Sequence, residues 1–207
     1  MFYQGHRNGS TWGLALGSRR TLWLKGRMSA ADEVVRRRVR AVKIAVRAVK
    51  TPLGTLRVAA SFDHVLYLEL PRRRGGGTPG PALDEYVLMR GDTPALRSAV
   101  VQLQEYFAGT RRRFDVPLDP AGTAFQHRVW NRVLAIPPGA TTSYGRLAAE
   151  LGGLALARAV GAAIGANPIP ILIPCHRVLG SDGSLVGYGG GLRMKVWLLR
   201  HEGVLLA

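Results

Sequence analysis

Residues 142–165 read TSYGRLAAELGGLALARAVGAAIG, and this stretch decides the fold of the C-terminal half. Thr142 or Ser143 can cap a short helix over Tyr144–Leu151, a glycine pair makes a tight turn, and 155–165 continue as a second short helix. Two short helices joined by a glycine turn predict a helix-turn-helix. Small residues dominate the second helix, which indicates either close packing in a core or close approach to a nucleic acid groove.

Upstream of that stretch, the pattern predicts two further helices and a small sheet. Residues at helical spacing form the apolar face of one helix, which closes at the 136–139 Ile-Pro-Pro-Gly; they are Phe125, Val129, Trp130, Val133 and Leu134. Another helix is expected from Asp92-Thr93-Pro94 to Gly109, with an apolar face of Leu96, Val100, Leu103 and Phe107. Period-two patterns predict an antiparallel meander at 43–50, 55–60 and 65–70, and RRRGGGTPGP at 72–81 predicts a loop.

These elements predict an α+β fold in three parts. Residues 1–42 form a basic N-terminal extension, and residues 43–118 form a small antiparallel sheet with a helix. Residues 119–207 form a mainly helical domain that carries the helix-turn-helix. The Pro-containing stretch 115–122 is the expected link between the second part and the third.

The net charge of +16 points to an anionic partner such as nucleic acid. Residues 1–50 carry twelve Lys or Arg and two Asp or Glu, so most of the excess lies in the N-terminal arm. That arm has the composition of a solvated tail or a transit peptide, and a simpler interpretation is a start at Met28 with 1–27 as an upstream extension. No apolar run reaches the ~20 residues of a membrane span, and one cysteine excludes an internal disulfide and a multi-cysteine zinc site.

The lone cysteine is followed directly by a histidine. An isolated cysteine is usually a small buried hydrophobe. Cys175, however, follows three closely spaced prolines and precedes a glycine-rich loop, and His176 can act as a base, directly or through a water, to make the reactive thiolate. Glu202, expected in the final helix, could orient that imidazole. The pattern indicates an activated cysteine nucleophile.

The string from Phe125 to Glu202 resembles the O6-alkylguanine-DNA alkyltransferases. The strongest match is Pro174-Cys175-His176-Arg177-Val178 with Asn167-Pro168 seven residues before Pro174. The other matching stretches are Phe125-Gln126, Val129-Trp130, Ile136-Pro137, Gly139, Ser143-Tyr144-Gly145, Leu147-Ala148, Arg158-Ala159-Val160-Gly161, Gly187-Tyr188-Gly189-Gly190, Lys195 and Leu198-Leu199. The resemblance spans residues ~45–205, more weakly in the N-terminal half.

The resemblance implies a suicide reaction. Cys175 would take the alkyl group from O6 of a guanine in DNA, with O4-alkylthymine as a second candidate substrate, once per molecule and without a cofactor. His176 would accept the thiol proton through a water, and Glu202 would hold His176. Tyr144 would donate to N3 of the leaving guanine, and Asn167 would tie the second helix of the helix-turn-helix, 155–165, to the cysteine loop. Pocket residues are expected to be Tyr188, Gly189 through its backbone N–H, the carbonyls of Cys175 and Val178, and Pro170, whose surroundings would set the size of alkyl group.

The same resemblance implies double-stranded DNA as the partner, bound through the minor groove with little sequence specificity. Arg158 would fill the place of the flipped base, and Ser143 and Ala157 are further expected DNA contacts. The protein is expected to be cytoplasmic, nucleoid-associated in a prokaryote, and monomeric, with no membrane contact. Some relatives hold a structural zinc ion through more than one cysteine. Because Cys175 is the only cysteine of this sequence, no such zinc site is expected.

Three other functions fit the sequence less well. A non-enzymatic lesion-binding relative would lack the reactive cysteine that Cys175 supplies. A helix-turn-helix transcription regulator would carry a second cysteine-bearing sensor domain. A cysteine hydrolase using Cys175 and His176 would pair adjacent residues, which rarely serve as nucleophile and base, and no oxyanion motif stands out.

Overall fold

The structure is a computed structural model that describes residues 42–71 and 86–204. The expected basic extension, apart from its last residue, and the predicted loop at 72–81 lie outside the described residues. Among the residues described, no helix is long and apolar enough to cross a membrane, and no group of three or more His, Cys, Asp or Glu could hold a metal ion.

The N-terminal half is built on a four-stranded sheet in the order β3-β2-β1-β4. The strands are β1 (Val42–Thr51), β2 (Gly54–Ala60), β3 (Val65–Glu69) and β4 (Tyr86–Leu88). The predicted antiparallel meander of the first three strands is confirmed, with Ala48 opposite Arg57 and Val58 opposite Leu68. The expectation of a purely antiparallel sheet was wrong, because β4 pairs parallel with β1. Three residues are too few to show a period, so the sequence did not reveal β4.

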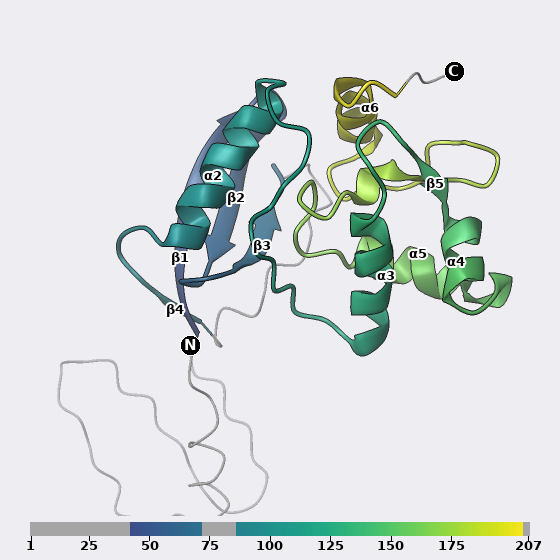
Figure 1. The fold of residues 1–207 in the computed structure, drawn as a ribbon, viewed down its shortest axis with the longest axis horizontal. Coiled ribbons are helices and arrows are strands. Elements are labelled where there is room, and N and C mark those ends of the chain that lie inside the picture. The colour runs from purple at the N-terminus through teal and green to yellow at the C-terminus, as the bar shows by residue number, and fades with distance from the viewer. Residues whose placement is uncertain (1–41, 72–85, 205–207) are drawn as a thin grey trace, which may run out of the picture. The chain divides into compact units, whose positions relative to one another are not determined.

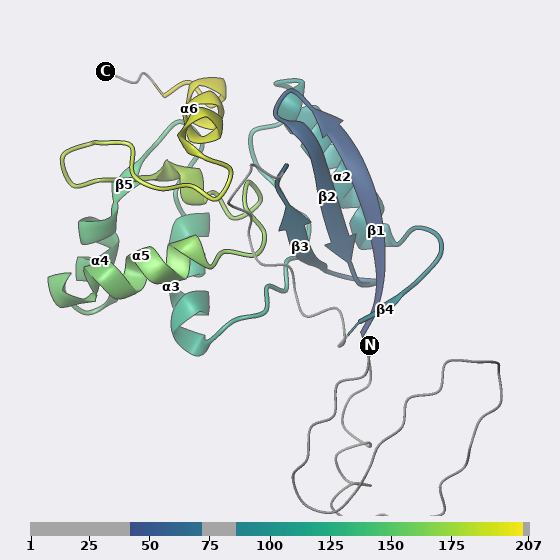
Figure 2. The same cartoon turned by 180° about the vertical axis from the view of Figure 1, so that it is seen from behind.

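Helix α2 (Pro94–Phe107) covers one face of this sheet (Figures 1 and 2). Thr93 caps it by accepting a hydrogen bond from the Leu96 amide at 3.1 Å, and Pro94 takes the first turn, as predicted. Leu96 and Leu103 are buried with the sheet residues in one core cluster.

The C-terminal half is mainly helical, as predicted. Its elements are α3 (Ala124–Leu134), β5 (Thr142–Ser143), α4 (Tyr144–Leu151), η2 (Leu154–Leu156), α5 (Ala157–Gly165), η3 (Cys175–Arg177), β6 (Val178–Leu179) and α6 (Leu192–His201). The second helix of the predicted pair begins at Ala157, because Leu154–Leu156 forms a 3₁₀ turn directly after Gly153, whose φ is 135°. Trp130 of α3 is buried and donates through Nε1 to the carbonyl of Ala163 on α5 at 2.8 Å, which fixes these two helices together.

One position of the predicted α3 apolar face was wrong: Leu134 is 43% exposed. Each step along a helix turns by about 100°, and Val133 already points into the core. Leu134, the next and last residue of α3, therefore points toward solvent.

The two halves share one hydrophobic core cluster. Backbone hydrogen bonds also join them: the Leu68 amide of β3 donates to the carbonyl of Pro168 at 2.9 Å. Pro168 belongs to the segment that leads into Cys175, so the sheet supports the cysteine loop directly.

Candidate active site

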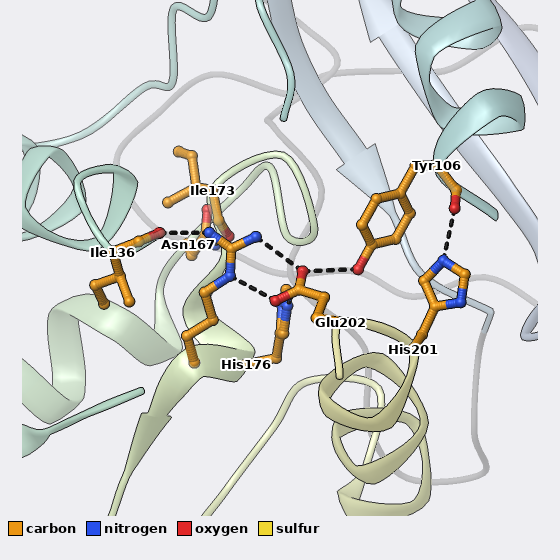
Figure 3. A network of polar contacts seen from close by, with 8 residues as sticks. Tyr106, Ile136, Asn167, Ile173, His176, His201 and Glu202 are labelled. Carbon is orange, nitrogen blue, oxygen red and sulfur yellow. Dashed lines mark hydrogen bonds and ion pairs between the residues drawn. The ribbon is translucent and has the colours of Figure 1, made fainter. Parts of the chain in front are cut away.

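The loop that carries Cys175 is held from inside by one asparagine. Asn167 is 3% exposed, and its Nδ2 donates to the Ile173 carbonyl at 2.9 Å (Figure 3). Its Oδ1 accepts from the Ile169 amide at 2.9 Å. Between these anchors Ile171 has a φ of 74°, the left-handed region that a β-branched residue rarely adopts. Asn167 thus connects the end of α5 to the turn that aims Cys175.

A two-residue parallel pair of strands places Tyr144 beside this loop. Thr142 of β5 lies opposite Val178 of β6, and Ser143 lies opposite Leu179. Because α4 starts at Tyr144, this pairing brings the start of α4 to the end of the cysteine turn. The sequence did not predict β5 and β6, although they decide how Tyr144 meets Cys175.

A buried ion network lies behind the cysteine. Glu202, 4% exposed, accepts from His176 Nε2 at 3.0 Å and from Arg177 Nη2 at 2.8 Å through Oε1, and from Arg177 Nε at 2.8 Å through Oε2 (Figure 3). Burial raises the pKa of Glu202, but the hydrogen bonds and charges of His176 and Arg177 outweigh it and hold that pKa far below its usual range. Glu202 is the C-cap of α6 and not a residue of the helix interior, because α6 ends at His201.

The network sets the tautomer of His176. An ionised carboxylate only accepts hydrogen bonds, so Nε2 carries the proton and Nδ1 of the neutral ring carries a lone pair. Nδ1 is buried and has no hydrogen-bond partner within the described part of the chain. Burial lowers the pKa of His176 against the opposing effect of Glu202, so the ring is neutral and Nδ1 is free to take a proton.

The thiol and the tyrosine both hold their protons at neutral pH. Burial raises the pKa of Cys175, although the Asn167 side chain and the charge of Lys195 act in the opposite direction. Burial also raises the pKa of Tyr144, and the charge of a Cys175 thiolate raises it further. Cys175 is therefore a thiol at rest that must be deprotonated to react, and Tyr144 is a hydrogen-bond donor.

Lys195 is a buried ammonium, and the sequence did not predict that it lies in this site. Its Nζ donates to the carbonyls of Val178 at 2.6 Å and Val186 at 2.7 Å, and burial lowers its pKa to about 8. The Val178 carbonyl, expected to bind guanine, thus already accepts a hydrogen bond from Lys195. Lys195 joins the cysteine strand to the loop that leads to Tyr188.

The expected pocket residues come from two places in the fold. Tyr188 has a buried hydroxyl with no partner among the described residues, and its ring meets the His176 ring edge-on at 6.5 Å. Gly189 is exposed beside it. Pro170 is buried in the turn of the cysteine loop, where it bridges to Ile173.

The expected DNA contacts lie on the first helix turns of the helix pair. Arg158 is exposed on α5, and Ala159 and Ala162 are exposed on the same helix, whereas Ala163 is buried. Three of the six Ala and Gly residues of α5 are thus exposed and only Ala163 is buried, which favours close approach of a ligand over core packing for the exposed face. Ala157 is half-buried at the start of α5, and the Ser143 hydroxyl accepts from the Arg146 amide at 3.1 Å as the cap of α4.

Arg177 also lines a pocket of about 180 Å³. Its walls include Phe114, Pro138 and Leu172, but not Cys175 or Tyr188. It is therefore separate from the space in front of the thiol.

Sequence reasoning missed three residues that shape this site: Arg177, Lys195 and Tyr106. Arg177 and Lys195 were only parts of matching motifs, and their charges were the available signal, since a buried charge needs partners. Nothing in the sequence pointed to Tyr106, whose hydroxyl donates to Glu202 Oε1 at 2.9 Å.

Known proteins match the chain over most of its length. The family described as "6-O-methylguanine DNA methyltransferase, DNA binding domain" matches residues 124–204, and "6-O-methylguanine DNA methyltransferase, ribonuclease-like domain" matches residues 44–120. A methylated-DNA–protein-cysteine methyltransferase of Mycobacterium tuberculosis is 44% identical over 156 residues, which are 75% of this chain and 90% of the relative. The Mycobacterium leprae protein of that name is 53% identical over the same shares. A crystal structure of Mycobacterium tuberculosis OGT in complex with DNA aligns with a TM-score of 0.65 at 42% identity, covering 78% of this chain and 92% of that one.

Proposed function

Because the chain belongs to the 6-O-methylguanine DNA methyltransferase family, we propose that Cys175 accepts the alkyl group and that its neighbours have distinct roles in one transfer. The protein is a DNA repair enzyme that moves the alkyl group of O6-alkylguanine in DNA irreversibly to its own cysteine. Cys175 is the only cysteine of the chain. The observation that carries the proposal is the buried His176–Glu202 pair, which leaves Nδ1 of the adjacent histidine open to a proton.

The first step is proton transfer. The thiol of Cys175 gives its proton, through a bridging water, to Nδ1 of His176, and the imidazolium that forms is stabilised by the ionised Glu202. Burial disfavours a free thiolate at rest, so the thiolate appears only as part of this ion pair. Glu202 is already ionised, which is the state that this role needs.

The second step is displacement at the alkyl carbon. The sulfur of Cys175 forms a bond to that carbon as the carbon–O6 bond breaks, and the bonding pair leaves with guanine. Tyr144 donates a proton or hydrogen bond to N3, which stabilises the leaving anion. The proton lost by the thiol balances the one that guanine gains. The product is a thioether, which is not a nucleophile, so each molecule reacts once.

Recognition of the base uses the loops around the thiol. The carbonyls of Val178 and Cys175 and the backbone N–H of Gly189 would contact the guanine edge, and Tyr188 would form a wall. Pro170, buried in the cysteine turn, would limit the size of the alkyl group. Asn167 keeps this turn in place through its two hydrogen bonds.

DNA would meet the exposed face of α5. We propose that α5 enters the minor groove, that its exposed alanines approach the sugar-phosphate walls, and that Arg158 fills the gap left by the flipped base. Ser143 and Ala157 lie at the starts of the two helices, where backbone amides face outward. These contacts carry little sequence information, which suits a protein that must find lesions anywhere.

We further propose that the domain boundary lies in the link at 115–122, with the DNA-binding domain beginning at residue 119. The match to the ribonuclease-like domain ends at residue 120, and the match to the DNA binding domain begins at residue 124, which supports this division. A repair protein for chromosomal DNA would act as a monomer in the cytoplasm, associated with the nucleoid.

The test is incubation of the protein with duplex DNA that contains O6-methylguanine, followed by mass spectrometry of the intact chain and its peptides. We expect one methyl group per molecule on the peptide that contains Cys175, and no turnover beyond one equivalent. Cys175→Ser is the control variant and should bind the DNA without gaining mass. A methyl group on another residue, or turnover beyond one equivalent, would contradict the proposal.

A further inference from the structure

The carboxylate of Glu202 is held by both halves of the chain. His176 and Arg177, next to Cys175, supply three of its hydrogen bonds. The fourth comes from Tyr106 on α2, whose hydroxyl donates to Oε1 at 2.9 Å across 96 positions of the sequence (Figure 3). Oε1 is the same oxygen that accepts from His176 Nε2. The N-terminal half thus contacts the one atom that orients the imidazole.

Tyr106 is itself fixed at both ends. Its side chain is almost fully buried, and its ring packs against that of Phe114, with centroids 5.1 Å apart. Its backbone carbonyl accepts from His201 Nε2 at 2.6 Å. One residue of α2 therefore binds two consecutive residues, His201 and Glu202, where α6 ends.

The contact between Tyr106 and Glu202 lies at the C-terminal end of α6. Glu202 is the C-cap of α6, and Gly203 follows with a φ of 87°, so the helical hydrogen-bond ladder stops there. The last turn of a helix frays unless other groups hold it. The hydroxyl of Tyr106, the guanidinium of Arg177 and the imidazole of His176 hold Glu202 in place from outside α6.

The hydroxyl is a permanent donor. A tyrosine hydroxyl has one proton, and here it is given to Glu202. Burial raises the pKa of Tyr106, and the negative charge of Glu202 raises it further. The hydroxyl therefore stays protonated over the whole working pH range of the reaction.

We propose that Tyr106 is a positioning residue for alkyl transfer: it holds Oε1 of Glu202 in line with His176, so that the N-terminal half sets the reactivity of Cys175. The inference rests on the proposed roles of His176 and Glu202. Tyr106 acts through the carboxylate of Glu202, to which its hydroxyl donates.

The proposal has two consequences for Tyr106→Phe, which keeps the buried ring and removes only the donor. First, the carboxylate is less constrained, so the maximal rate of cysteine alkylation falls about 3–10-fold, the effect of one hydrogen bond. Second, the charge on Oε1 is shared among fewer donors and stabilises the imidazolium more, so the acid limb of the rate profile moves to higher pH. The other titratable or charged groups around this pair are Arg177, Cys175, Tyr188, Lys195 and His201, and the variant leaves all of them in place.

The experiment uses the full chain and free O6-benzylguanine, a substrate that needs no DNA binding. The rate of alkylation is measured from pH 5 to 9 for the native protein, for Tyr106→Phe and for the control Phe107→Leu. Phe107 packs against Tyr106 and Trp197 but donates nothing to Glu202. The control therefore weakens the contact between α2 and α6 without changing the carboxylate. Thermal melts set an assay temperature at which all chains are folded.

We expect a slower rate and a shifted acid limb for Tyr106→Phe, and a native profile for Phe107→Leu. Equal profiles for both variants would overturn the proposal and leave Tyr106 a packing residue. Glu202→Gln, measured in parallel, distinguishes a failure of the role of Tyr106 from a failure of the His176–Glu202 relay. If Glu202→Gln slows the reaction and Tyr106→Phe does not, only the role of Tyr106 fails. If Glu202→Gln reacts at the native rate, the relay of the proposed function fails, and the role of Tyr106 fails with it.

Discussion

Replacing Glu202 by glutamine should destabilise the protein severely, although the two side chains have the same shape. Glu202 forms a two-point ion pair with Arg177, and both side chains are nearly inaccessible to water. Removing one partner of a buried pair costs about 3–5 kcal/mol, because the other charge is left uncompensated. Glu202 accepts all four of its hydrogen bonds. The amide nitrogen of glutamine is a donor, so it would face at least one of these donors without forming a hydrogen bond.

This loss is large against the total free energy of unfolding, which is about 5–15 kcal/mol for a typical domain. The Tm should fall by about 6–20 °C at about 2–4 °C per kcal/mol for a chain of this size. Urea unfolding, followed by tryptophan fluorescence to which the buried Trp130 contributes, measures the free energy of unfolding directly. The double variant Arg177→Met with Glu202→Gln is the control: it also removes the orphaned cation and should be more stable than Glu202→Gln alone.

The difference between the native protein and Glu202→Gln should depend on pH. The folded-state pKa of Glu202 lies below its unfolded value of 4.5, so the stabilisation is complete above pH 4.5 and is lost as the pH falls toward the folded-state pKa. The two unfolding curves should therefore converge in acid. A loss below 1 kcal/mol at pH 7 with an unchanged m-value, or a difference that does not depend on pH, would refute the reasoning.

Three further outcomes follow from the same geometry. The rate of reaction with free O6-benzylguanine should fall on the acid side only below pH 6.5, since burial lowers the pKa of His176, and an acid limb above pH 6.5 would contradict this. Arg158→Ala should slow repair of duplex DNA more than reaction with the free base, and equal losses in the two rate assays would assign Arg158 to the pocket. Trp130→Phe should lower the free energy of unfolding by about 1–3 kcal/mol in urea titrations, because the buried carbonyl of Ala163 loses its donor; a change within error would show that water replaces it.

Local signals in the sequence were enough for most of the fold. The Thr93 cap with Pro94 after it, the glycine pair after Leu151 and the period-two strands act over a few residues, and the structure has the corresponding elements. The prediction was less accurate where an element is short. β4, β5 and β6 have two or three residues each, too few to show a period, and they exist because distant strands offer them backbone partners.

The site divides in the same way. The Cys175-His176 pair and the Asn167 position are adjacent enough in sequence to form a motif, so the sequence by itself determined the chemistry and the family. Only the tertiary structure decided that Glu202 reaches His176, that Lys195 occupies the Val178 carbonyl and that Tyr106 completes the carboxylate's shell. The physical reason is that a buried charge must be satisfied by whichever donors the packed chain brings within 3 Å, and sequence spacing does not encode that distance.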